Sequence, residues 1–136
     1  MTDAALVTSI AVINCVDGFV GDPVLRWVQE RFGVPASNVM TLWAPDKALS
    51  ETTPHRISKT KAYILRCLAA KPAQLIIVIG HEGCTTNPVS REAHLRQLQQ
   101  SVDTLASWEL NKQGPRMIVW GLWMGVDGSA EVAYER

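Results

Sequence analysis

One uninterrupted apolar run near the middle of the chain limits the fold more than any other feature. The five residues from Leu75 to Ile79 are all aliphatic, four of them are β-branched, and the run stops at Gly80. Such a run is typical of a strand that is buried on both faces inside a parallel sheet. The chain is therefore expected to belong to the α/β class, in which strands alternate with helices.

Two potential metal ligands follow this strand directly. His81 and Cys84 stand in an H-x-x-C spacing, at the kind of strand end where open α/β sheets bind their ligands. Histidine and cysteine are also the two commonest zinc ligands. Taken alone, the spacing is weak evidence, because an ordinary loop at the start of a helix can carry the same residues.

A second stretch, near the N-terminus, has the same form. An apolar segment over residues 10–13 is followed by Cys15, Asp17 and Gly18. If both strands end at one edge of the sheet, Cys15, His81 and Cys84 supply two thiolates and one imidazole to a zinc ion. That set leaves one position for water, a substrate or Asp17. Asp17 before Gly18 also suits a tight turn, so a purely structural role for this carboxylate stays open.

The remaining pattern predicts a regular alternation of elements. Strands are expected over residues 6–14, 37–43, 75–79, 117–124 and 130–134, and helices over residues 22–33, 55–70 and 91–112. Asp22 is expected to be the N-cap of the first helix, and Gly33 to end it. The polar stretch from Ala44 to Pro54 lacks periodicity and is expected to be a functional or mobile loop. Asp127-Gly128 predicts a hairpin turn before the last strand.

Each predicted helix has an apolar stripe that should face the sheet. His94 is expected to lie off its stripe, in solvent, and Cys67 is expected to be a small core residue. The residues expected to be buried are Val24, Leu25, Val28 and Phe32 in the first helix, Ile57, Tyr63, Ile64, Cys67 and Leu68 in the second, and Leu95, Leu98, Val102 and Leu105 in the third.

This order predicts a single α/β domain over residues 1–136, with a mostly parallel central sheet flanked by helices and a closing antiparallel edge strand. Right-handed crossovers would place the ends of the first and third strands at the same edge. Cys15 is then expected to approach His81 and Cys84.

Composition narrows the function classes. The formal net charge is zero, so neither nucleic acid nor an anionic membrane is the expected partner. No secretory signal is evident, and the longest uncharged apolar run, residues 117–126, is too short to span a bilayer. Three cysteines suit a reducing cytoplasm better than a disulfide framework. The hydrophobic fraction of 47% and five tryptophans favour a homodimer or higher homo-oligomer.

Together, Cys15-Val16-Asp17 and His81-Glu82-Gly83-Cys84 resemble the two zinc-binding motifs of the β-class carbonic anhydrases. The tail from Gly121 to Glu135 is similar to the closing strands of that family. The resemblance implies a zinc cofactor held by Cys15, His81 and Cys84, with Asp17 beside the metal as a catalytic carboxylate or fourth ligand. It implies a β-carbonic-anhydrase-like fold, and hydration of carbon dioxide by zinc-bound hydroxide.

The chain departs from the family pattern at several positions. The family has an arginine that pairs with the aspartate, and Phe19 stands in its place. Thr85 follows the second cysteine where the family has glycine. The loop after the second strand reads Trp43-Ala44-Pro45-Asp46, and the N-terminal helical arm of the family is missing.

Two functions therefore stay open. One is a carbonate dehydratase-type zinc lyase acting on carbon dioxide or a small analogue such as carbonyl sulfide. The other is a weak or inactive zinc-binding relative with a structural, binding or regulatory role. Phe19, Trp43 and Trp27 are expected either to wall an apolar pocket or simply to pack, including at a subunit interface. Gly18 and Thr85 are also expected to belong to the pocket.

Overall fold

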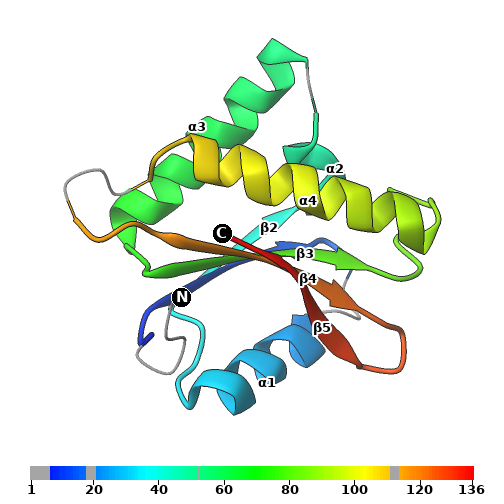
Figure 1. Cartoon of the computed structure of the whole chain (residues 1–136), viewed down its shortest axis with the longest axis horizontal. Coiled ribbons are helices and arrows are strands. Elements are labelled where there is room, and N and C mark those ends of the chain that lie inside the picture. The colour runs from blue at the N-terminus through cyan, green and yellow to red at the C-terminus, as the bar shows by residue number, and fades with distance from the viewer. Residues whose placement is uncertain (1–6, 18–20, 52, 111–113) are drawn as a thin grey trace.

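A computed structural model describes residues 7–17, 21–51, 53–110 and 114–136, and it shows a sheet with helices on both faces (Figure 1). The strands are β1 (Ile10–Cys15), β2 (Asn38–Leu42), β3 (Leu75–His81), β4 (Ile118–Met124) and β5 (Ala130–Glu135). The helices are α1 (Gly21–Phe32), α2 (Pro45–Leu49), α3 (Pro54–Ala70) and α4 (Arg91–Ser107).

The five strands lie in the order β2-β1-β3-β4-β5. β1 pairs in parallel with both β2 and β3, β3 pairs in parallel with β4, and β5 runs antiparallel to β4. This confirms the predicted α/β class, the mostly parallel sheet and the antiparallel edge strand. None of the helices in the described part of the chain is long and apolar enough to cross a membrane.

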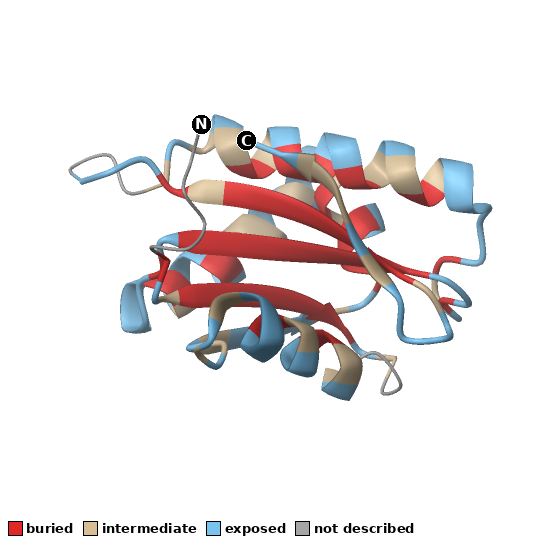
Figure 2. Cartoon of the chain, turned by 60° about the horizontal axis from the view of Figure 1, so that its bottom comes forward, coloured by how far each residue is buried: buried red, intermediate tan, exposed pale blue. Residues whose placement is uncertain are grey.

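Alternation along the central strands divides the core between the two faces of the sheet. Leu75, Ile77 and Ile79 pack on the side that α1 covers, and Ile76 and Val78 pack on the side of α2, α3 and α4. All seven residues of β3 are buried, as the apolar run predicts (Figure 2). Because both faces are covered, the ends of these strands are fixed by packing from two sides.

A glycine on β3 allows α4 to lie close to the sheet. A Cβ atom at Gly80 would stand only 3.0 Å from Leu98 Cδ1 and 3.0 Å from Asp46 Oδ2. Gly80 thus leaves room for α2 and α4 to pack against the end of β3, next to His81. This residue ends the apolar run because a larger side chain does not fit there.

The polar stretch from Ala44 to Pro54 is not simply a loop, and this expectation was wrong. Its first part forms α2, in which Pro45, Asp46 and Leu49 are buried. Ala44 adopts a left-handed conformation with φ of 45°, which turns the chain from β2 into the helix. Hydrophobic periodicity missed the helix because one of its three buried residues is an aspartate.

His94 also differs from the prediction, since it is only 1% exposed rather than solvated. Its Nδ1 lies 2.6 Å from Asp46 Oδ2. Asn87 Nδ2 donates to Gln97 Oε1 at 2.7 Å and lies 3.4 Å from Asp46 Oδ1. Ser101 Oγ donates to the Asp46 carbonyl oxygen at 2.8 Å. These five side chains form a buried polar network that joins α2 and α4 to the loop after β3.

Smaller corrections concern element ends and two side chains. β1 begins at Ile10, later than predicted, and residue 6 of the predicted range lies outside the described residues. α4 ends at Ser107, and residues 111–112 of its predicted range also lie outside the described residues. α1 already includes Gly21, so Asp22 lies in its first turn and is not the N-cap. Leu25 and Tyr63 are 37% and 39% exposed. The Tyr63 hydroxyl accepts a hydrogen bond from the Thr41 amide at 3.3 Å, which explains its place at the surface.

We predict that Asp46→Ala destabilises the fold by roughly 2–5 kcal/mol, because it leaves buried polar groups of His94 and Asn87 without their acceptor. Asp103→Ala is the matched control, since Asp103 pairs with Arg136 at 2.9 Å but both side chains are 52% exposed. The control is expected to cost about 0–1 kcal/mol. Urea unfolding of both variants measures the difference, and equal losses would contradict the structural importance of the network.

Candidate metal centre

The ends of β1 and β3 bring four potential metal ligands together. Pairing of Ile13 with Val78 sets the register, so Cys15 at the end of β1 lies beside the end of β3. One ligand atom from each of Cys15, Asp17, His81 and Cys84 lies within 4.8 Å of the others. The expected meeting of the two motifs at one sheet edge is therefore observed, and this is the metal-ligand cluster found among the described residues.

The two thiols are spaced as a shared metal requires. Cys15 Sγ and Cys84 Sγ lie 3.8 Å apart, and both cysteines are buried and free of disulfides. A disulfide needs about 2.05 Å between the sulfur atoms. Two thiolates at about 2.3 Å from one tetrahedral zinc ion would be about 3.8 Å apart. The sulfur pair therefore fits a tetrahedral metal and not a disulfide.

His81 presents its second ring nitrogen to the cluster. Its Nδ1 lies 3.0 Å from the Glu82 carbonyl oxygen, and a carbonyl can only accept, so Nδ1 carries the proton and donates. In the neutral ring, Nε2 then keeps a lone pair, and it lies 3.6 Å from Asp17 Oδ2. A backbone carbonyl bound to the far nitrogen is the usual way in which a ligand histidine is oriented.

Asp17 is held by a residue of the other motif. The Thr85 amide donates to Asp17 Oδ2 and the Thr85 hydroxyl donates to Asp17 Oδ1, both at 2.9 Å. These two hydrogen bonds lower the pKa of Asp17, and the bond from the Thr85 backbone amide has the larger effect. Burial of the carboxylate acts in the opposite direction and raises its pKa. Attraction to His81 whenever its ring is protonated, and a hydrogen bond with the Cys84 thiol, lower the pKa of Asp17 further by smaller amounts. The donors to Asp17 thus come from Thr85, a residue for which the sequence analysis predicted no such role.

The loop that carries Cys84 is fixed at both ends. Gly83 turns the chain with φ of 73°, and the Glu82 side chain accepts a hydrogen bond from the Val126 amide at 3.0 Å. After the cysteine, the Asn87 amide donates to the Cys84 carbonyl oxygen at 3.3 Å. The Asn87 side chain then enters the buried polar network described above. Cys84 and Thr85 are therefore positioned by hydrogen bonds to the turn after β4 and to α4.

The donor set fits a metal ion with an affinity for sulfur and nitrogen. Two thiols, an imidazole and a carboxylate converge, and thiolate with imidazole ligands is typical of zinc. Cys15, His81 and Cys84 are 4%, 1% and 2% exposed, whereas the Asp17 side chain is 16% exposed. Among the described residues, Asp17 is therefore the most exposed member of the cluster.

The residues that were expected to line a pocket lie in different surroundings. Gly18 and Phe19 lie outside the described residues. Trp43 is 63% exposed and lines a shallow surface pocket of about 290 Å³ that Thr86 and Arg56 also line. Trp27 instead packs edge-on against Phe32 and Trp120, with ring centroids 6.2 and 6.5 Å away, which supports the core-packing alternative.

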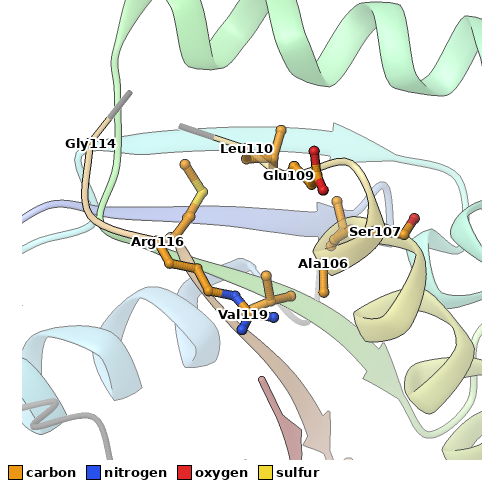
Figure 3. A pocket seen from close by; sticks show the side chains of 9 residues that line it. Ala106, Ser107, Glu109, Leu110, Gly114, Arg116 and Val119 are labelled. Atoms are coloured by element: carbon orange, nitrogen blue, oxygen red, sulfur yellow. The ribbon is translucent and has the colours of Figure 1, made fainter. Parts of the chain in front are cut away.

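A larger pocket, of about 660 Å³, lies near the start of β4, away from the strand ends that carry Cys15 and His81 (Figure 3). It is formed where α4 ends and β4 begins, and its lining includes Leu105, Glu109, Arg116 and Val119. Neither a cysteine nor a histidine lines it. The pocket is therefore separate from the metal-ligand cluster.

Comparison of the sequence with protein families gives one match that spans nearly the whole chain. The family model described as "Putative carbonic anhydrase" matches residues 6–134. The chain belongs to this family. No curated protein matches the chain.

Solved structures of β-carbonic anhydrases share the fold. Isoform I from Trichomonas vaginalis is 14% identical, with a TM-score of 0.54 over 98% of this chain and 87% of that one. A tetrameric β-carbonic anhydrase from Sordaria macrospora is 13% identical, with a TM-score of 0.50 over 95% and 82% of the two chains. The enzyme CafA of Aspergillus fumigatus is 18% identical, with a TM-score of 0.50 over 95% and 77%. At these identities the likeness establishes the fold alone.

Proposed function

We propose that this chain is a zinc-dependent lyase of the carbonic anhydrase type, which hydrates carbon dioxide or a small analogue such as carbonyl sulfide. The observation that carries the proposal is the meeting of Cys15, His81 and Cys84 at one sheet edge, with a sulfur-to-sulfur distance of 3.8 Å. Family membership supports the same assignment. Cys15, His81 and Cys84 would hold the zinc ion.

Bound zinc supplies a Lewis acid, and in known carbonic anhydrases it lowers the pKa of a bound water to about 7. The protein contributes the surroundings. The Glu82 carbonyl fixes the tautomer and the orientation of His81. Both cysteines and His81 are buried, which limits the access of water to these three residues. Carbon dioxide and water would enter on the side of Asp17.

Asp17 is suited to orient the reacting water by accepting a hydrogen bond from it. Hydration joins water to carbon dioxide, and the proton released as bicarbonate forms passes to solvent or buffer, because a carboxylate with a lowered pKa is a weak base. Each carboxylate oxygen of Asp17 accepts one hydrogen bond from Thr85 and keeps a second lone pair. The carboxylate can therefore accept a hydrogen bond from the reacting water while Thr85 holds it in place. Its lowered pKa keeps it ionised at neutral pH.

The alternative function is a structural zinc site in a relative with little or no activity. The observation that favours it is the position of Asp17 Oδ2, only 3.6 Å from His81 Nε2. If Asp17 also bound the zinc, four protein ligands would close the site, as in structural zinc centres. Zinc content and hydration, measured on the same samples, separate the two functions.

We predict that the chain carries one zinc ion and hydrates carbon dioxide, and that Cys15→Ser and Cys84→Ser lose both properties. Cys67→Ser is the matched control, because Cys67 is free, lies on α3 and is not part of the cluster. Elemental analysis gives the zinc content, and stopped-flow hydration gives the rate. A zinc-free wild type would contradict the metal centre, whereas bound zinc without hydration would contradict the enzyme and support the structural alternative.

The chain is further proposed to act as a homo-oligomer in the cytoplasm, within a single domain over residues 1–136. The described part of β2 pairs only with β1, so it forms an edge of the sheet, and Val39 and Trp43 near this edge are 45% and 63% exposed. One of the related solved proteins is described as tetrameric.

We predict a dimer or larger species in sedimentation, because pairing at this edge would cover exposed apolar side chains. Trp43→Ser is expected to weaken the association, and Val126→Ser serves as a control, since Val126 is 64% exposed but lies at the turn before β5, at the other side of the sheet. A monomeric wild type at working concentration would contradict the proposal.

A further inference from the structure

Thr86, the second residue after Cys84, places its hydroxyl beside a sulfur atom of the metal-ligand cluster. Its Oγ1 lies 3.5 Å from Cys84 Sγ. A thiolate that binds a metal carries no proton, so it can only accept, and the hydroxyl is then the donor. Among the described residues, this is the one hydrogen bond of the Thr86 side chain. The hydroxyl proton is therefore available to the sulfur.

We propose that Thr86 acts on the metal through Cys84, because its hydroxyl donates to the thiolate and reduces the negative charge that this sulfur gives to the ion. This inference rests on the proposed zinc site. Two thiolates supply more negative charge than neutral imidazoles do, which weakens the ion as a Lewis acid. Hydrogen bonds to the ligand atoms are a general means of adjusting a bound metal. Thr86 is thus a positioning residue that opposes part of this weakening.

A tight turn brings the hydroxyl back to the sulfur. The Asn87 amide donates to the Cys84 carbonyl oxygen at 3.3 Å, so residues 84–87 form a β-turn in which Thr86 is the third residue. The Asn87 side chain donates to Gln97 Oε1 of α4 at 2.7 Å, which holds the end of the turn. The sequence thus places the donor two residues after the ligand, on a segment that the buried polar network fixes.

The contact makes the two sulfur ligands different from each other. Cys15 and Cys84 are only 4% and 2% exposed, so bulk water can supply few hydrogen bonds to either. Within the described part of the chain, Cys15 Sγ has its contact with Cys84 Sγ, and no hydroxyl donates to it. The neighbouring hydroxyl of Thr85 is directed to Asp17 instead, at 2.9 Å. Cys84 is therefore the ligand whose charge a hydroxyl can reduce.

Cobalt(II) in place of zinc tests the proposal without any measure of turnover. Light that moves an electron from sulfur to cobalt gives an absorption band whose energy reports the charge on the sulfur, and a hydrogen bond raises that energy. Thr86→Val keeps the shape of the side chain and removes the donor, so its band is expected at longer wavelength than in wild type. Its cobalt affinity, measured by competition with a coloured chelator, is expected to fall about tenfold, because losing a contact that supports a metal ligand typically lowers affinity by about 10–100-fold.

Two further variants separate the hydrogen bond from a general disturbance of the loop. Thr86→Ser keeps the hydroxyl and is expected to match wild type in band position and affinity. Thr60→Val is the matched control, because Thr60 lines the same surface pocket as Thr86 but its hydroxyl donates to the Arg56 carbonyl oxygen at 3.2 Å. It is expected to leave both measurements unchanged.

The proposal is overturned if Thr86→Val keeps the wild-type band, if Thr86→Ser shifts it as Thr86→Val does, or if Thr60→Val produces the same shift. A wild type that shows no band from sulfur to cobalt would contradict the zinc site itself, and the role of Thr86 with it. The spectrum of the wild type alone therefore shows which of the two proposals has failed.

Discussion

Parallel pairing of β1 with β3 is the interaction on which the rest of the structure depends. The register from Ile10 with Leu75 to Ile13 with Val78 places the ends of two buried strands side by side. Both strands are covered on both faces, so neither can shift without exposing its apolar side chains. The cluster of potential metal ligands is a consequence of this pairing, because Cys15 and His81 are the last residues of β1 and β3 and Cys84 follows in the next loop.

The buried polar network also supports the loop that carries Cys84. Gly80 leaves room for Asp46 and Leu98, and Asp46 then binds His94 inside the protein. Asn87 connects this pair to the segment that carries Cys84 and Thr85. The strands thus place the ligands, and the buried network fixes the loop that holds Asp17 in position. A departure from the expected family pattern, Thr85, has become part of this support.

The parts of the fold that were predicted are those encoded in neighbouring residues. The apolar run from Leu75 to Ile79 and the H-x-x-C spacing fixed β3 and its ligands, and the Asp127-Gly128 turn with the last antiparallel strand was confirmed. The meeting of Cys15 with His81 and Cys84 followed from the handedness of crossovers, which is a general property of parallel sheets.

The parts that were missed depend on polar contacts between distant residues. Asp46 and His94 are 48 positions apart, and Asp17 and Thr85 are 68 apart, so no local pattern connects them. A signal for His94 was present, because it stands four residues before Leu98 and eight before Val102, on the buried face of α4. Hydrophobicity alone assigned it to solvent, although a histidine at stripe spacing is also compatible with a buried polar pair.

The central claim is that two thiolates and one imidazole at this sheet edge bind one zinc ion. X-ray absorption of the zinc-loaded protein tests it most directly, because sulfur and nitrogen or oxygen ligands differ in distance. Zinc held by these residues would have two sulfur atoms at about 2.3 Å and two nitrogen or oxygen atoms at about 2.0–2.2 Å. A first shell without sulfur, or with one sulfur atom only, would contradict it.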